Sequence, residues 1–186
     1  MTRIILLTGP KRSGKTTACR RFVENGRRAN MAIGGIVSPA RYDHRGQKRG
    51  IDIIDLTTGQ RRALATTASS PQEATVGKYR FYPGAIRWAR RRALSALAAP
   101  LDVVIVDEIG PLELEQKQGF ATALDRLSTS RAKIAILIVR DSLVSQLQEK
   151  LKALQPETMH LCNTNRNQIP HHLYKMVRDL LSPPRD

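Results

Sequence analysis

The stretch GPKRSGKT at residues 9–16 constrains the fold of this chain more than any other feature. It matches the phosphate-binding pattern G-x-x-x-x-G-K-[ST]. The apolar run at residues 4–7 predicts a buried strand before it, and residues 16–25 predict a helix after it. Strand, glycine-rich loop and helix then follow in the order of a phosphate cradle, because the N–H groups of the loop and of the helix N-terminus point at one anion.

The motif assigns chemistry to its polar residues. We expect Lys15 to bridge two phosphate groups and the Thr16 hydroxyl to ligate Mg²⁺. Thr17 is a further candidate, as a donor to the α-phosphate. The nucleotide-binding residues predicted from the motif are Gly9, Pro10, Lys11, Arg12, Ser13, Gly14, Lys15, Thr16 and Thr17.

A second motif, VVIVDEIGP at residues 103–111, follows the Walker B pattern of an apolar strand that ends in an acid. Asp107 is predicted to hold Mg²⁺ together with Thr16. An acid at the position of Glu108 orients or deprotonates a water molecule, which favours hydrolysis. The predicted catalytic residues are Lys15, Asp107 and Glu108, and the predicted metal ligands are Thr16 and Asp107.

Other charged residues receive roles from their positions. Glu113 and Glu115 are predicted only to cap the helix that follows. A cation must neutralise the charge that develops on the γ-phosphate. Arg140 is expected to face the site, because it ends a predicted strand, and ligands of open α/β sheets bind at the carboxyl ends of strands. For each candidate arginine, a role at the solvated surface is the alternative. The candidates for this cation are Arg12, Arg41, Arg140 and Arg166, and a partner protein is an alternative source.

The rest of the chain alternates strand and helix patterns. Further strands are predicted at residues 32–37, 50–56, 61–65, 79–81, 103–106 and 134–139. Further helices are predicted at residues 83–98, 120–127, 143–154 and 169–180. The pattern indicates an α/β fold of the P-loop NTPase class in one domain, residues 1–186, with a doubly wound, mostly parallel sheet. This is a RecA-like arrangement with the catalytic Glu after Walker B, and strands 50–56 and 61–65 form a β-hairpin insertion.

The net charge of +15 lies entirely in the first half of the chain. Residues 1–100 hold 20 Lys or Arg and 5 Asp or Glu, whereas residues 101–186 hold 11 of each. Such a surface attracts nucleotides and polyanions. A solvated basic face is the equally weighted alternative. Few aromatic residues accompany the charge, so the sequence gives little support for a base-stacking surface. The densest run holds Arg87, Arg90, Arg91 and Arg92.

Composition also sets expectations for location. No apolar stretch reaches membrane-spanning length, and the first one belongs to the first strand, so neither a membrane anchor nor a signal peptide is expected. Cys19 and Cys162 form no C-x-x-C pattern and are expected to be free thiols in a reducing cytoplasm. We expect a monomer with no structural metal site.

The chain resembles the family of small P-loop nucleoside-triphosphatases first described from thermophiles, whose human relative is called cancer-related nucleoside-triphosphatase. The stretches that carry the resemblance are GPKRSGKTT at 9–17, GGIVSPAR at 34–41, RGIDIIDLTTG at 49–59, VGKY at 76–79, VVIVDEIGPLEL at 103–114 and TNRN at 164–167. The resemblance implies slow, Mg²⁺-dependent hydrolysis of ATP, GTP and other NTPs with little base discrimination. It also places Asn165 and Arg166 beside the nucleobase, as further nucleotide-binding residues.

Two departures from the family pattern bear on function. Arg12 stands where the family usually has a glycine, and the segment YDHRGQK at residues 42–48 is basic where relatives often are acidic. Substrate or partner preference is therefore open. The alternatives to an NTPase are a nucleoside or small-molecule kinase, whose acceptor would bind in the insertion, and a nucleic-acid-binding protein gated by nucleotide, which would bind weakly through the basic N-terminal half.

Overall fold

The computed structural model describes residues 1–73 and 77–182. Val76, the first residue of the VGKY stretch, lies outside them. The strands are β1 (Arg3–Thr8), β2 (Ile33–Val37), β3 (Ala40–Tyr42), β4 (Lys48–Asp55), β5 (Arg61–Thr67), β6 (Tyr79–Phe81), β7 (Val103–Ile109), β8 (Ile134–Val139) and β9 (Glu157–His160). The helices are α1 (Lys15–Arg28), α2 (Pro83–Ala98), α3 (Pro111–Leu114), α4 (Ala121–Asp125), α5 (Val144–Lys150) and α6 (Ile169–Leu181).

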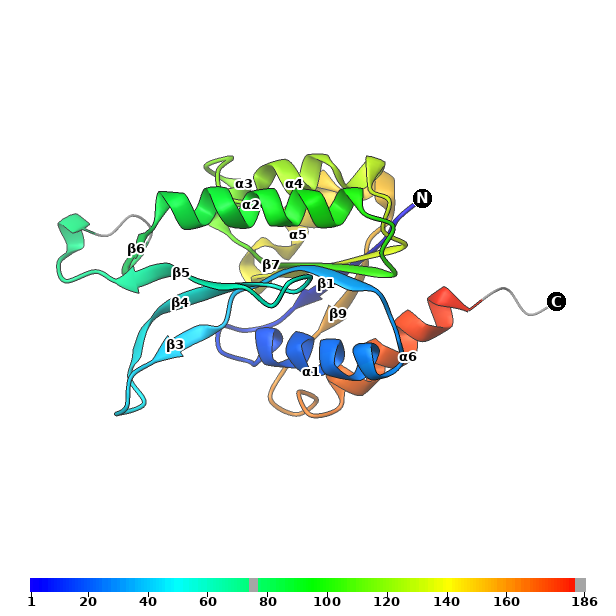
Figure 1. The fold of residues 1–186 in the computed structure, drawn as a ribbon, viewed down its shortest axis with the longest axis horizontal. Coiled ribbons are helices and arrows are strands. Elements are labelled where there is room, and N and C mark those ends of the chain that lie inside the picture. Colours follow the sequence, from blue (N-terminus) through cyan, green and yellow to red (C-terminus); the bar gives the residue numbers. More distant parts are fainter. Residues whose placement is uncertain (74–76, 183–186) are drawn as a thin grey trace.

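One sheet runs through the molecule in the order β6-β5-β4-β2-β7-β8-β1-β9, with β3 paired to β4. The strands from β2 to β9 in this order pair in parallel. Helices α1 and α6 cover one face of this part and α2 to α5 cover the other (Figure 1). The predicted doubly wound α/β fold of the P-loop class is confirmed. Strand β8 separates β1, which leads into the phosphate loop, from β7, which carries the acidic pair.

Alternate residues of the central strands belong to two separate hydrophobic cores, one on each face of the sheet. Ile4 and Leu6 of β1 pack on the side of α2, whereas Ile5 and Leu7 pack with Phe22 of α1. All six residues of β8 are buried. Parallel strands covered by helices on both faces need such continuous apolar runs, and each fully buried Leu or Ile contributes roughly 1.5–3 kcal/mol. The core therefore fixes the strand ends at which the motifs sit.

The insertion is larger than the predicted hairpin. Strands β3, β4, β5 and β6 pair antiparallel and form an extension of the sheet beyond β2 that projects from the body (Figure 1). We call these four strands the wing. The two hairpin strands and the short strand at residues 79–81 are confirmed. Strand β3 was not predicted, because a segment of three residues is too short to show a periodicity.

Several helix boundaries differ from the sequence prediction. The predicted helix at residues 120–127 is α4 followed by a 3₁₀ turn at Leu127–Thr129. The one predicted at 143–154 is α5 with 3₁₀ turns on both sides. Such tighter turns commonly finish short helices. Across residues 1–73 and 77–182, no helix is both long and apolar enough to cross a lipid bilayer.

The arginine run of α2 is not the free cationic surface that the sequence suggested. Arg92 pairs with the buried carboxylate of Asp55 at 3.5 Å, and its guanidinium lies 5.7 Å from the centre of the Trp88 ring. Arg90 is half-buried, so Arg87 and Arg91 are the two exposed members of the run. Arg92 therefore joins α2 to β4, and its removal would disturb packing as well as charge.

Candidate active site

The phosphate loop and the acidic pair meet at one edge of the sheet. Strands β1, β8 and β7 are parallel neighbours, so their carboxyl ends lie together. The loop at residues 9–14 follows β1, Asp107 and Glu108 lie at the end of β7, and Arg140 follows β8. This edge is where ligands of open α/β sheets bind.

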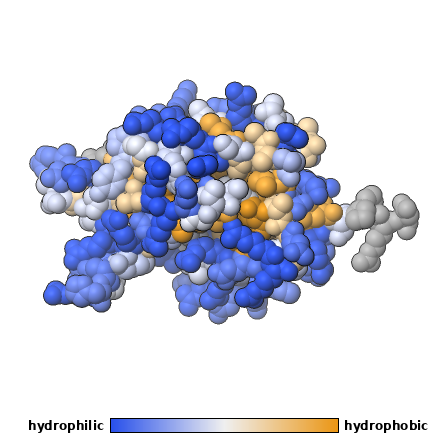
Figure 2. Space-filling view, viewed as in Figure 1, coloured by the Kyte–Doolittle hydropathy of each residue, from blue (hydrophilic) through white to orange (hydrophobic). Residues whose placement is uncertain are grey.

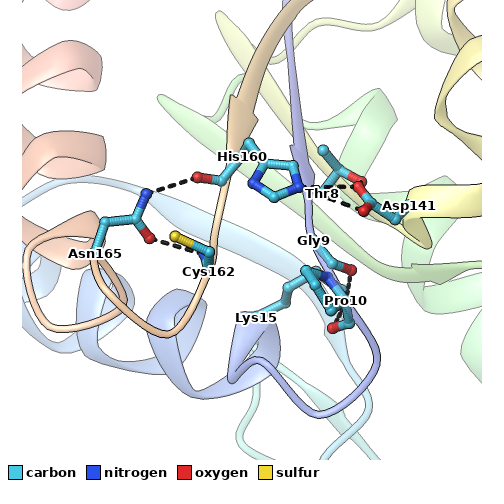
Figure 3. Close-up of polar contacts among 8 residues, drawn as sticks. All are labelled: Thr8, Gly9, Pro10, Lys15, Asp141, His160, Cys162 and Asn165. Atoms are coloured by element: carbon cyan, nitrogen blue, oxygen red, sulfur yellow. Dashed lines mark hydrogen bonds and ion pairs between the residues drawn. The ribbon is translucent and has the colours of Figure 1, made fainter.

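Lys15 is held inside the loop by main-chain oxygens. Its ammonium donates to the carbonyl of Gly9 at 2.7 Å and to that of Pro10 at 3.0 Å (Figure 3). The residue is 9% exposed. Burial lowers the pKa of Lys15, while the negative charges of Glu108 and Asp107 oppose that shift. An ammonium has three donors, so one N–H remains for a ligand.

Gly9 is required where the loop leaves β1. Its φ of +144° is rarely adopted by other residues, and a Cβ there would lie 2.0 Å from the carbonyl oxygen of Leu161. The Leu161 N–H in turn donates to the Thr8 carbonyl at 2.8 Å. The first glycine therefore allows the loop to pass directly against the segment that follows β9.

Arg12 adopts a positive φ of +66°, in the left-handed region that glycine prefers. It occupies the position where the resembled family usually has glycine. The Arg12 side chain and its neighbour Lys11 are exposed, whereas Ser13 is buried. The loop thus keeps a backbone shape suited to glycine while it carries an additional cation.

Asp107 is the buried acid of the site. Its carboxylate accepts a hydrogen bond from the Thr16 hydroxyl at 2.9 Å and another from the Ser38 N–H at 3.0 Å. The Ser38 hydroxyl donates to the main-chain oxygen of Asp107. Burial, with a further contribution from the charge of Glu108, raises the pKa of Asp107 to about 7. Sequence reasoning missed Ser38, which the pairing of β2 with β7 brings to the site.

The oxygen donors here fit Mg²⁺. Thr16 and Asp107 present a hydroxyl and a carboxylate that already lie within hydrogen-bond distance. Mg²⁺ typically takes one or two protein oxygens and completes its shell with phosphates and water. Among the described residues no group of three or more His, Cys, Asp or Glu side chains gathers in a metal-binding arrangement. Thr16 and Asp107 therefore fit a Mg²⁺ site whose remaining ligands are phosphate oxygens and water.

Glu108 does not share the partners of Asp107. Its carboxylate forms an ion pair with Arg140, and both side chains are partly exposed at the strand ends. Arg140 also acts on the ammonium of Lys15, whose pKa its charge helps to lower. The expectation that Arg140 faces the site is thus consistent with the geometry. Of the other candidate cations, Arg41 pairs with Asp52 at 3.5 Å, and Arg12 and Arg166 are exposed.

A polar cluster beside the loop was not predicted from the sequence. The Thr8 hydroxyl donates to Asp141 at 3.1 Å, and Asp141 lies 3.2 Å from the imidazole of His160 (Figure 3). These residues end β1, follow β8 and end β9. The sequence gives only a weak indication of this cluster, because single polar residues at the ends of apolar strands are common. The cluster closes the site on the β9 side.

Asn165 is committed to the loop that contains it. Its amide donates to the His160 carbonyl at 2.9 Å, and its side-chain oxygen accepts from the Cys162 N–H at 2.8 Å (Figure 3). Hydrogen bonds from Thr164 and from the main chain lower the pKa of the Cys162 thiol. Thr17 of α1 and Arg166 of this loop are both exposed. The structure therefore gathers the motif residues 9–16 with Asp107 and Glu108 closely, and Asn165 less directly.

Glu113 caps α3, as predicted, and also binds the main chain at Phe120. Its carboxylate accepts from the Gly110 N–H at 2.8 Å and from the Phe120 N–H at 3.1 Å. Burial raises the pKa of Glu113 to about 7, against the effect of these two bonds. Glu115 is exposed at the other end of α3 and makes no such cap. Glu113 thereby fixes the segment that leaves β7.

Comparison with known proteins identifies relatives over nearly the whole chain. A family model described as NTPase matches residues 4–174. The chain is 29% identical over 184 residues to nucleoside-triphosphatase THEP1 of Methanopyrus kandleri, which covers 97% of this chain and 98% of that protein. It is 31% identical over 137 residues to the THEP1 of Ignicoccus hospitalis, with 73% and 75% of the two chains covered.

Solved structures agree on the fold. The solution structure of a human cancer-related nucleoside triphosphatase superposes with a TM-score of 0.75 at 22% identity, over 96% of this chain and 98% of that one. The crystal structure of THEP1 from Aquifex aeolicus gives 0.68 at 20% identity, over 94% and 98%. With the family match, these likenesses confirm the resemblance seen in the motifs. The chain belongs to the NTPase family, and it is an enzyme of the nucleoside-triphosphatase class.

Proposed function

We propose that this NTPase hydrolyses the β–γ bond of nucleoside triphosphates with Mg²⁺, within a single domain of residues 1–186. The observation that carries the proposal is the 2.9 Å contact between Thr16 and Asp107 at the mouth of the phosphate loop. It joins the two motifs that a metal-assisted phosphoryl transfer needs. The proposed catalytic residues are Lys15, Asp107 and Glu108.

Phosphate binding is assigned to the loop and to the start of α1. The free donor of Lys15 and the N–H groups of the first helical turn supply positive potential. The buried hydroxyl of Ser13 has no hydrogen-bond partner among the described residues. Buried hydroxyls are normally satisfied, and a bound phosphate oxygen would satisfy this one. Gly9, Pro10, Lys11, Arg12, Gly14 and Thr17 complete the proposed binding set.

Thr16 and Asp107 are the proposed ligands of Mg²⁺. The ion would neutralise charge on the phosphate oxygens. The protein holds the oxygen atoms of Thr16 and Asp107 in place for the ion. Ser38 helps to fix Asp107, because its N–H donates to the carboxylate and its hydroxyl donates to the main-chain oxygen. The exchange of the Thr16–Asp107 hydrogen bond for metal ligation requires only small side-chain movements, because both oxygens are already adjacent.

Glu108 is the proposed base for the attacking water. It is partly exposed at the carboxyl end of β7, where water can reach it, and Arg140 lies beside it. Arg140 is then the proposed cation for the transition-state charge, because it pairs with Glu108 and its charge acts on Lys15. An arginine tied to the base in the free enzyme must be released before it can serve the phosphate, which is consistent with slow turnover.

The loop that follows β9, with Asn165 and Arg166, supports broad specificity for the nucleobase. Asn165 uses both its side-chain polar groups within its own loop. Arg166 is exposed, and we propose that it and Asn165 border the base by contact and stacking rather than by reading its edge. Such contacts discriminate poorly between purines and pyrimidines, since every base presents a π-face.

A panel measurement tests the proposal. The protein is incubated with ATP, GTP, CTP and UTP, with Mg²⁺ or with EDTA, and released phosphate is measured without any acceptor. Phosphate release from all four with Mg²⁺ and none with EDTA supports it. Release of diphosphate product only when a nucleoside or sugar acceptor is added would favour the kinase alternative. The same preparation, sized by light scattering, tests the proposed monomer.

The cytoplasm is the proposed location. Cys19 is a buried free thiol and Cys162 a half-buried one. Burial raises the pKa of the Cys19 thiol well above its ordinary value, which keeps it protonated. Free thiols persist in reducing compartments.

A further inference from the structure

The wing carries an excess of positive charge. Residues 40–82 hold eight Lys or Arg against four Asp or Glu. Figure 2 shows that the end of the molecule formed by the wing is covered mostly by hydrophilic residues. Two of the three large apolar side chains that are exposed among the described residues are Tyr42 of β3, at 61% exposure, and Tyr82, which directly follows β6, at 38%. Cations and exposed aromatic rings therefore share this surface.

Some of the cations are neutralised within the wing. Arg41 and Arg61 both pair with Asp52, and Arg49 pairs with Asp43. The side chains of five further cations form no ion pair with any described residue. These five are Arg45, Lys48, Arg62, Lys78 and Arg80, and Arg62 lies over the ring of Trp88. The positive potential of the wing thus comes from charges that no acid of the described chain balances.

Three strands place aromatic and cationic side chains in one row. Tyr42 of β3 lies opposite Lys48 of β4, and directly opposed residues of an antiparallel pair share a face. The Lys48 ammonium lies 5.1 Å from the centre of the Tyr79 ring of β6, and that of Lys78 lies 5.8 Å from it. Tyr79 therefore gathers two ammonium groups, while the more exposed ring of Tyr42 stays open beside them.

We propose that the wing binds single-stranded nucleic acid through this row, independently of the NTPase site. Lys48 and Lys78 contact successive backbone phosphates, and a base stacks on Tyr42. A basic sheet surface with exposed aromatic rings is the usual platform for unpaired bases. A duplex hides its bases, so it would use the cations alone. The shared chemistry of RNA and DNA strands, a phosphodiester backbone with unstacked bases, is what the row recognises.

Fluorescence anisotropy tests the proposal directly. Labelled oligo-U, oligo-dT and a duplex, each of about 15 nucleotides, are titrated with the full-length protein between about 50 and 200 mM salt. We expect both single strands to bind, the duplex to bind more weakly, and affinity to fall steeply with salt. The ratio of the affinities for oligo-U and oligo-dT shows whether the protein prefers RNA or DNA.

Matched variants separate stacking from charge. Tyr42→Ala should weaken single-strand binding about fivefold or more, whereas Tyr42→Phe should retain it, because the ring stays. The double variant Lys48→Gln/Lys78→Gln should reduce the salt slope by about 1.4, for two single-strand phosphate contacts. The control Arg131→Gln/Lys175→Gln removes two exposed cations from the neutral half and should leave the slope unchanged. Basal NTP hydrolysis shows that each variant is folded.

Four results would overturn the proposal. They are no anisotropy change with either single strand at low salt, equal or tighter binding of the duplex, identical affinity of Tyr42→Ala and the unmodified protein, and an equal loss in the Arg131/Lys175 control. The last would mean that total charge alone attracts the strand. Binding to anionic vesicles without binding to either strand would also contradict it.

Discussion

The Thr16 hydroxyl donates a 2.9 Å hydrogen bond to the Asp107 carboxylate across 91 residues of chain. Thr16 belongs to the first turn of α1, and Asp107 to the end of β7, a strand separated from β1 by β8. The contact forms because α1 starts against the sheet edge at which β7 ends. It defines where a metal ion and the triphosphate would meet.

Removal of the loop cation should weaken both binding and turnover. Lys15→Ala deletes the ammonium whose third donor is free for phosphate, and charge-assisted hydrogen bonds of this kind are worth about tenfold or more in affinity. Isothermal titration with a non-hydrolysable ATP analogue measures the affinity. Lys175→Ala, an exposed cation on α6, is the matched control and should bind normally. Unchanged affinity in Lys15→Ala would mean that nucleotide binds elsewhere.

Ser38 should set the Mg²⁺ requirement without touching the nucleotide. Ser38→Ala removes the hydroxyl that bonds the main chain of Asp107. A neutral hydrogen bond contributes about 0.5–1.5 kcal/mol, so the Mg²⁺ concentration for half-maximal phosphate release should rise about two- to tenfold. Ser145→Ala, which removes an exposed hydroxyl from α5, serves as the control. The prediction fails if the two variants require the same Mg²⁺ concentration.

The parts of the site that the sequence predicts are those built from neighbouring residues. The loop at residues 9–16 and the acids at the end of β7 are local patterns whose chemistry is tied to spacing. Contacts made by Ser38 and the ion pair of Arg140 with Glu108 depend on strand order, which no local pattern contains. The short strand β3 escaped prediction for a related reason, since its pairing rather than its own residues makes it a strand.

Arg12 should store backbone strain in the phosphate loop. Its φ of +66° costs a residue with a Cβ about 1 kcal/mol or more. Arg12→Gly should therefore unfold at a higher denaturant concentration than Arg12→Ala, by about 1 kcal/mol in the free energy of unfolding, although both lose the same charge. Urea titrations of the two variants measure this difference. An Arg12→Ala variant as stable as Arg12→Gly would show that the loop carries no such strain.

Glu113 should make stability depend on pH. Burial raises the folded-state pKa of its carboxyl to about 7, above the ordinary value of 4.5. The folded protein therefore binds this proton more tightly than the unfolded chain. The stability from the protonated form is fully present below about pH 4.5 and is lost as the pH rises through about 7.

Glu113→Gln removes that titration. The free energy of unfolding of the unmodified protein, relative to this variant, should fall between pH 5 and pH 8, as measured by urea unfolding at several pH values. Each unit of difference in pKa corresponds to about 1.4 kcal/mol. A difference between the two proteins that stays constant with pH would contradict the assignment.

A substitution at Glu108 separates nucleotide binding from hydrolysis. Glu108→Gln keeps the size and hydrogen-bonding groups of the side chain but removes the carboxylate. We expect near-normal affinity for Mg²⁺-nucleotide, with phosphate release in single turnover slowed about 10²-fold or more. Phosphate release at the unmodified rate would contradict this expectation, because the base that activates water would then lie elsewhere.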